Sequence, residues 1–266
     1  MMGPVSEWER LRADLADEQA AVAALVGPPA HTDWGRATPA AGWDVHDQIA
    51  HLAYFDAAAA QALHDESAFL AQREVLAHAA TSRELDAATL ARGEDPGRLL
   101  ARWAAAREDL ATALAQVEPG RRVPWYGPAM SAVSFARARL METWAHGHDV
   151  SVALDRPLEP TDRLVHVARL GLATRAWSYR VRAETPPPGR VGLRLGAPSG
   201  ATWTLGPEDA DDWVEGPAED LCLVVTQRRH VEDTALRAGE LARHWLVRAQ
   251  AFAGGPTLPP APGQGS

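Results

Sequence analysis

Residues 44–55, which read DVHDQIAHLAYF, contain the strongest helix signal in the chain. Asp44 is a good N-cap residue because its carboxylate can accept a hydrogen bond from a free backbone N–H of the first turn. Asp47 adds negative charge to that turn, which the helix dipole favours. The stretch therefore predicts the start of a long helix. Its apolar positions are Ile49, Leu52, Ala53 and Phe55.

Three further long helices are expected in the first 155 residues. One has apolar residues at spacings of three, four and seven between Trp8 and Leu25. Another follows the start signal at residues 95–97, Asp-Pro-Gly, and the last runs from about Ser131 to Leu154. Four helices connected in this way are typical of an antiparallel four-helix bundle.

The connections in this part are less regular. Phe69, Val75 and Leu76 predict a further helix, and Ser82 can cap a short one before Gly93. Residues 118–128 contain several Pro and Gly residues and predict a break between helices.

The sequence changes character after residue 157. Residues 164–183 predict one helix. A Pro-rich run lies beyond its end and prevents the helix from continuing. Residues 191–195 alternate between aliphatic side chains and Gly or Arg, which predicts a strand paired with residues 201–205. Further expected elements are a strand at 212–215 and helices at 218–226 and 239–252.

The expected fold class is mainly α, with an α+β C-terminal part. The expected boundaries place the helical bundle at residues 1–155 and a small α+β domain at 156–255. The Pro/Gly-rich tail, 256–266, is expected to be disordered.

Composition excludes several functional classes. The chain of 266 residues has a formal net charge of −9, which disfavours a nucleic-acid partner. A single Cys excludes a disulfide framework or a multi-cysteine metal site, and the absence of Lys excludes a lysine Schiff base or a P-loop. With no signal-peptide pattern and no long apolar run, the sequence predicts a soluble cytoplasmic protein without a membrane partner.

Three side chains form the strongest candidate metal site. Glu142 and His146 are four residues apart on the last bundle helix and so share one face. His51, on a facing helix, would complete two histidines and a carboxylate, a common catalytic zinc environment with an open fourth position. The same spacing also fits a solvated Glu–His pair on an outer face, although the apolar neighbours of these residues make unpaired polar groups costly.

His148 competes with His146 as a ligand. It lies six residues after Glu142, about a third of a turn away from that face, so His146 is preferred and His148 is expected near the pocket. Asp47 and Asp149 are candidates for fixing a histidine tautomer.

Other candidates have equally simple structural explanations. Arg228, with Arg229, can bind a carboxylate of a cofactor or lie in solvent as a basic pair. Trp125 and Tyr126 can line the mouth of a pocket or anchor the core. Cys222, among aliphatic residues, is expected to be a buried small hydrophobe.

Three stretches also resemble a known family. Residues 41–52, AGWDVHDQIAHL, resemble the GW-x-V-x-D-x-x-x-H-L signature of DinB-like proteins. Residues 124–128 and 141–149, PWYGP and METWAHGHD, resemble the mycothiol-dependent maleylpyruvate isomerase-like group of actinobacteria, including a branch described as metal-binding. The resemblance implies a DinB-like bundle followed by a domain resembling sterol carrier proteins.

The resemblance also implies a ligand set and a chemistry. In that family a divalent metal, usually zinc, is held by residues that correspond to His51, Glu142 and His146. It implies mycothiol as a cosubstrate, whose metal-bound thiolate adds to a small electrophilic substrate in isomerisation or thiol transfer. His46 and His148 depart from the residues expected at their positions and are candidates for proton transfer.

Two alternatives stay open at this point. One is a thiol-independent, metal-dependent hydrolase, lyase or cyclase of specialised metabolism, using a metal-activated water. The other is a non-catalytic metal-binding module. The sequence does not indicate an oligomeric state.

Overall fold

The computed structural model describes residues 6–77 and 89–265. The chain divides into two compact units, Met1–Leu158 and Glu159–Ser266. The first is mainly helical, and the second contains a small mixed sheet, as expected from the sequence. Within the described ranges, no helix combines the length and apolar character needed to cross a membrane.

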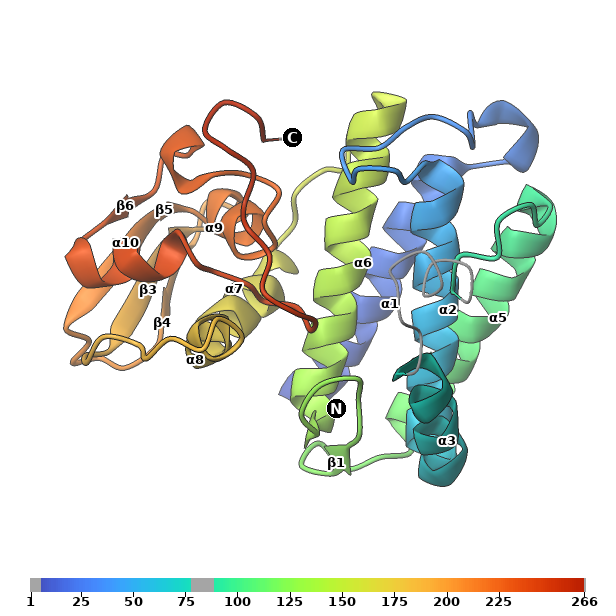
Figure 1. Cartoon of the computed structure of the whole chain (residues 1–266), viewed down its shortest axis with the longest axis horizontal. Helices are drawn as coiled ribbons and strands as arrows, with labels where there is room; N and C mark the ends of the chain where they lie inside the picture. The colour runs from blue at the N-terminus through green and yellow to red at the C-terminus, as the bar shows by residue number, and fades with distance from the viewer. Residues whose placement is uncertain (1–5, 78–88, 266) are drawn as a thin grey trace, which may run out of the picture. The chain divides into compact units, whose positions relative to one another are not determined.

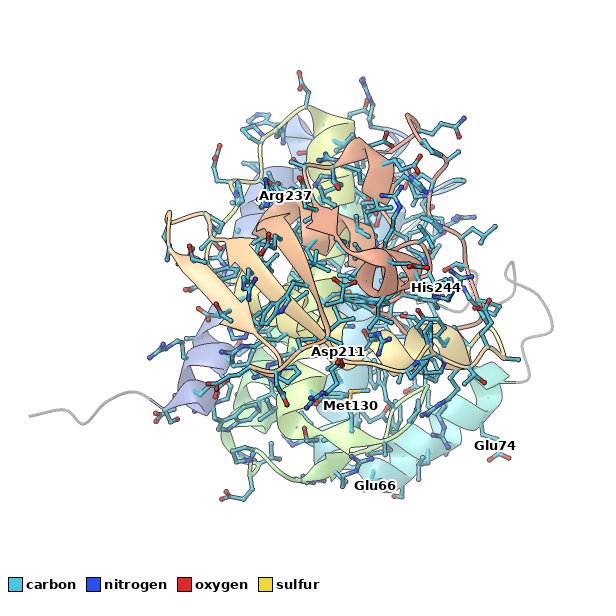
Figure 2. The ribbon with its side chains drawn as sticks, turned by 90° about the vertical axis from the view of Figure 1, so that its left-hand side faces the viewer. Glu66, Glu74, Met130, Asp211, Arg237 and His244 are labelled. Carbon is cyan, nitrogen blue, oxygen red and sulfur yellow. The ribbon has the colours of Figure 1, made fainter. Side chains whose placement is uncertain are left out.

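Four long helices lie side by side in the first unit (Figure 1). Their bounds are α1 Glu7–Val26, α2 Val45–His64, α5 Pro96–Ala115 and α6 Ala132–Leu154. The shorter α3, Glu66–Ala77, packs on α2, and Figure 2 labels two residues of its exposed side, Glu66 and Glu74. Between α5 and α6 lies a two-stranded hairpin, β1 Arg122–Val123 and β2 Met130–Ser131. A short 3-10 turn, Pro29–His31, follows α1.

The helices begin where side chains can satisfy free backbone N–H groups. Asp44 accepts from the backbone N–H of Asp47, as the sequence predicts, and Asp95 accepts from that of Arg98. Ser131 accepts from the backbone N–H of Ser134 at the start of α6. These caps fix the registers in which α2 and α6 present their side chains.

A buried polar network connects all four long helices. Asp56 on α2 is fully buried, and its Oδ1 accepts from Nε and Nη2 of Arg139 on α6 at 3.1 and 2.9 Å. Its Oδ2 accepts from Gln19 on α1 at 2.9 Å and from the Trp103 indole on α5 at 3.0 Å. Because a buried carboxylate is costly unless it is paired and hydrogen-bonded, this network favours one arrangement of α2 relative to α6.

The second unit contains a four-stranded mixed sheet in the order β4-β3-β5-β6. Strand β3 runs parallel to β5, and the other pairs are antiparallel. Helices α7, α9 and α10 pack against its central strands. The bounds are β3 Val191–Gly196, β4 Thr202–Leu205, β5 Asp212–Pro217, β6 Arg237–Ala238, α7 Leu164–Ala173, α8 Arg175–Arg180, α9 Ala218–Val225 and α10 Glu240–Leu246, with a 3-10 turn at Val231–Asp233.

One expected helix of this unit is divided. The helix predicted at 164–183 is α7 followed by α8, with the division at Thr174. The Thr174 hydroxyl donates to the carbonyls of Leu170 and Gly171 at 2.9 and 3.0 Å. Such back-bonding competes with the helical hydrogen bonds and bends or ends a helix.

Another expected helix is shorter. The helix predicted at 239–252 ends at Leu246. Backbone N–H groups farther along the chain donate to acceptors outside this helix. The N–H of Gln250 donates to the Ser178 hydroxyl at 3.0 Å, and that of Ala251 to the Val225 carbonyl at 2.9 Å. Strand β6, which has only two residues, was not predicted from the sequence.

The C-terminal segment, for which the sequence predicts disorder, has no regular secondary structure over residues 256–265. It makes hydrogen bonds to other parts of the second unit. The backbone N–H of Thr257 donates to the Gln250 side chain at 3.2 Å, and that of Gly263 to Asp233 at 2.8 Å. The cap expected at Ser82 lies outside the described residues.

Candidate metal centre

The predicted ligands meet between α2 and α6. Oε2 of Glu142 lies 3.6 Å from Nε2 of His51 and 3.3 Å from Nε2 of His146. One ligand atom from each residue lies within 4.8 Å of the other two. The three side chains are 17%, 22% and 12% exposed in the order His51, Glu142, His146, so the group is partly covered and still reachable from solvent.

These separations fit a small divalent cation. Ligand atoms about 2.1 Å from zinc, placed in tetrahedral directions, lie about 3.4 Å from one another. Two imidazole nitrogens and one carboxylate oxygen form a donor set that zinc commonly uses. The donor chemistry and the spacing therefore both suit a zinc ion held by His51, Glu142 and His146.

The pKa values of His51 and Glu142 favour the protonation states that bind a metal ion. Burial, followed by the nearby His146, lowers the pKa of His51 from 6.5 to about 4. Burial alone would raise the pKa of Glu142, but hydrogen bonds and charges from His146 and His51 outweigh it and hold this pKa well below its usual value. At neutral pH, His51 is therefore neutral and Glu142 ionised, the protonation states that bind metal.

Aromatic rings surround the two imidazoles. The Trp43 ring stacks on that of His146, with centroids 5.9 Å apart and planes 18° apart, and lies 5.2 Å from the His51 ring. Phe55 lies 4.5 Å from the His51 ring on the other side. These rings shield the imidazoles from water and limit how they can turn.

Trp125 and Tyr126, candidates for lining the mouth of a cofactor pocket, belong to an aromatic cluster that includes Phe55. The Tyr126 ring lies 5.4 Å from that of Phe55, and Trp125 stacks on Phe69 at 5.6 Å with planes 3° apart. Burial, followed by neighbouring Tyr54, raises the pKa of Tyr126. Both residues anchor the core beside the candidate metal centre.

His46 and His148, predicted as proton-transfer groups, are not part of the three-residue group. Nε2 of His46 lies 3.0 Å from the Glu94 carbonyl oxygen. His148 follows His146 by two residues, about 200° around α6, and its ring lies 6.0 Å from that of Trp144.

A second set of potential ligands, Asp44, His46 and Asp47, lies at the start of α2. Its members have structural roles. Asp44 caps the helix, and Asp47 accepts from Nε and Nη2 of Arg92 at 2.9 and 2.8 Å.

The remaining candidates lie in the second unit. Arg228 donates to the Thr226 carbonyl at 2.8 Å. Arg229 pairs with Asp220 at 3.3 Å. Cys222 is buried, as predicted, and burial raises the pKa of its thiol well above its usual value.

Gln48 was not identified from the sequence. Its Oε1 lies 2.5 Å from Nδ1 of His146, although the two residues are 98 positions apart. Gln48 is one turn before His51 on α2, and it is fully buried. The signal that the sequence offers is an amide side chain one turn before His51 on the same helix.

Comparisons with known proteins identify the family of the chain. The family model described as the mycothiol maleylpyruvate isomerase N-terminal domain matches residues 15–151. Two uncharacterized proteins of Mycobacterium tuberculosis, from strains CDC 1551 and H37Rv, are each 43% identical over 245 residues, which cover 92% of this chain and 95% of theirs.

Solved structures share the fold. The crystal structure of the mycothiol-dependent maleylpyruvate isomerase is 17% identical with a TM-score of 0.55, and the match covers 88% of this chain and 93% of that one. A histidine-to-alanine mutant of that isomerase gives a TM-score of 0.54 at 16% identity, covering 87% and 93%. With the family match over residues 15–151 and the 43% identical relatives, the chain belongs to the mycothiol maleylpyruvate isomerase N-terminal domain family.

Proposed function

We propose that this protein is a zinc-dependent enzyme that uses a low-molecular-weight thiol, mycothiol by preference, to act on a small electrophilic substrate. The observation that carries the proposal is the meeting of His51, Glu142 and His146, whose ligand atoms lie within 4.8 Å of one another. Three protein ligands leave a fourth position for an exogenous ligand, as in catalytic zinc sites.

When bound there, zinc would supply the charge that keeps a coordinated thiol deprotonated. The chain's own residues prepare the site for that chemistry. The Glu142 carboxylate contributes the single negative charge of the ligand set, and the imidazole of His51, whose pKa is lowered to about 4, contributes none at neutral pH. Trp43 and Phe55 cover the imidazoles and exclude water from their faces.

The family supports the thiol as the exogenous ligand. The solved structure that shares the fold is a mycothiol-dependent maleylpyruvate isomerase, so maleylpyruvate is the first electrophile to test. The proposal covers both isomerisation and thiol transfer, because both reactions begin with attack by the same thiolate.

The proposal is tested by metal analysis and calorimetry. We expect the purified protein to bind one zinc per chain, and the double variant His51→Ala/His146→Ala to bind none above background. His64→Ala is the matched control, since His64 also lies on α2 but contacts Asp109 at 3.1 Å outside the group. Stoichiometric zinc in the double variant would contradict the ligand assignment.

Mycothiol binding is measured by isothermal titration into the zinc-loaded and the chelated protein. We expect binding only with zinc, and isomerisation of maleylpyruvate only with both present. Binding of equal affinity to the chelated protein, or no binding to the zinc-loaded one, would overturn the thiol role.

A further inference from the structure

A chain of hydrogen bonds connects His146 to the loop before α2. Nδ1 of His146 lies 2.5 Å from Oε1 of Gln48. Nε2 of Gln48 donates to Oγ1 of Thr38 at 2.8 Å, and Oγ1 of Thr38 donates to the Trp43 carbonyl at 3.0 Å. We refer to these contacts as the Trp43–His146 hydrogen-bond chain.

The direction of each bond follows from its last member. The Trp43 carbonyl oxygen can only accept, so the Thr38 hydroxyl uses its single proton there. The Thr38 oxygen must then accept from the amide nitrogen of Gln48, which turns the amide oxygen toward His146. An amide oxygen cannot donate, so Nδ1 of His146 carries the proton in this contact.

The consequence concerns the other ring nitrogen, Nε2, which lies 3.3 Å from Glu142. An imidazole that keeps its proton on Nδ1 can give the lone pair of Nε2 to a metal that displaces the proton shared with Glu142. We propose that Gln48, held by Thr38, is a positioning residue that fixes His146 in the tautomer whose Nε2 can bind the metal. The inference rests on the proposed zinc site, and it names residues that the ligand set alone does not.

The surroundings of Gln48 hold it in this orientation. Gln48 is fully buried, so its amide is costly unless both ends are hydrogen-bonded. The loop that carries Thr38 is closed by a bridge between Ala37 and Asp44, and the backbone N–H of Thr38 donates to the Trp43 carbonyl at 2.9 Å.

The same loop also sets the plane of the ring. Its Trp43 side chain stacks on His146 at an angle of 18°, while Thr38 and Gln48 control the proton on that ring. The loop before α2 and Gln48 on α2 therefore together determine the orientation and the tautomer of a proposed ligand on α6.

Two pairs of variants separate the hydrogen bond from simple packing. Gln48→Met keeps the size of the side chain and removes the acceptor, whereas Gln48→Glu keeps an acceptor for Nδ1. Thr38→Val removes the hydroxyl that orients the amide, and Thr38→Ser retains it. Gln72→Met is the matched control, because Gln72 lies on α3 and donates to Tyr54.

The first measurement is the His146 tautomer in the chelated protein, by long-range ¹H–¹⁵N NMR at pH 7.5. We expect a protonated Nδ1 in the wild type, Gln48→Glu and Thr38→Ser, and a mixture of tautomers in Gln48→Met and Thr38→Val. In the wild-type protein, a His146 ring with an unprotonated Nδ1 and a protonated Nε2 would overturn the proposal. That result would leave the assignment of the zinc ligands unchanged.

The second measurement is zinc affinity by competition with a chromogenic chelator. Removing an outer partner of a metal-bound histidine typically weakens binding about 10–100-fold, and we expect this for Gln48→Met. Gln48→Glu, Thr38→Ser and Gln72→Met should stay close to wild type, and Thr38→Val should fall between. Wild-type affinity in Gln48→Met would overturn the positioning role, whereas failure of every protein to bind zinc would overturn the proposed function instead.

Discussion

At the scale of single residues, His51 shows how burial prepares a candidate metal ligand. Its imidazole lies between Phe55 and Trp43 and next to His146. This setting lowers its pKa from 6.5 to about 4, because the charged form loses water and meets a second imidazole. The imidazole of His51 therefore binds a proton more weakly in the folded protein than in the unfolded chain.

This shift predicts how the stability of the chelated protein depends on pH. Because the pKa of His51 is lower in the folded state, the unfolded state binds more protons between pH 6.5 and about 4, and stability falls as the pH falls through that window. From pH 7.5 to 5.0 the loss due to His51 is on the order of 2 kcal/mol. Urea unfolding should show this loss in the wild type and a smaller one in His51→Ala. An equal loss in both proteins would show that His51 does not cause it.

The sequence predicted the three candidate ligands more fully than the residues that hold them in place. His51, Glu142 and His146 could be named because an i, i+4 pair lies on one helix face and the family motifs mark the same positions. Gln48 could not be linked to His146, because no local spacing relates residues 98 positions apart. His46 contacts a backbone carbonyl, which residue type does not predict.

At the scale of elements, the candidate metal centre depends on how closely the helices approach. Gly147, next to His146, lies where α6 crosses α1. A Cβ added at Gly147 would overlap a methyl group of Val22 and lie 3.3 Å from Cδ2 of Leu158. Glycine at this position therefore allows the close contact between α1 and α6.

Gly147→Ala tests this contact. Alanine favours a helix by about 1 kcal/mol, but overpacking a buried site costs about 1–3 kcal/mol, so we expect a net loss of about 1 kcal/mol. In Val22→Ala, which removes the overlapping methyl groups, the added Gly147→Ala should instead stabilise. Urea unfolding of the two single variants and the double variant measures the coupling. Additive changes would show that the two helices do not meet closely at Gly147.

Element boundaries were predictable where a cap or a breaker decides them. Asp44, Asp95 and the residues near Ser131 mark the starts of α2, α5 and α6. The end of α10 was not predictable, because the backbone of Gln250 leaves the helix to bond Ser178, 72 residues away. Tertiary hydrogen bonds of this kind leave no local pattern in the sequence.

At the scale of the whole molecule, all three proposed ligands belong to the first of two compact units. A ligand that binds only the folded state stabilises it by about 2.7 kcal/mol when its free concentration is 100 times its Kd. Zinc should therefore stabilise the first unit directly, through the helices that carry its ligands.

Hydrogen–deuterium exchange locates this effect. On adding zinc, we expect slower amide exchange in α2 and α6 around the ligands, and smaller changes in strands β3 and β5 of the second unit. The chelated double variant His51→Ala/His146→Ala serves as the reference. Protection that begins in the sheet and spares α2 would place the metal elsewhere.

The most direct test of the proposed zinc site is a crystal structure of the zinc-loaded protein with diffraction recorded on both sides of the zinc absorption edge. We predict one strong anomalous peak per chain, within about 2.2 Å of Nε2 of His51, Nε2 of His146 and a carboxylate oxygen of Glu142. A peak at Asp44, His46 and Asp47 instead, or full zinc occupancy at any place away from the three predicted ligands, would contradict it.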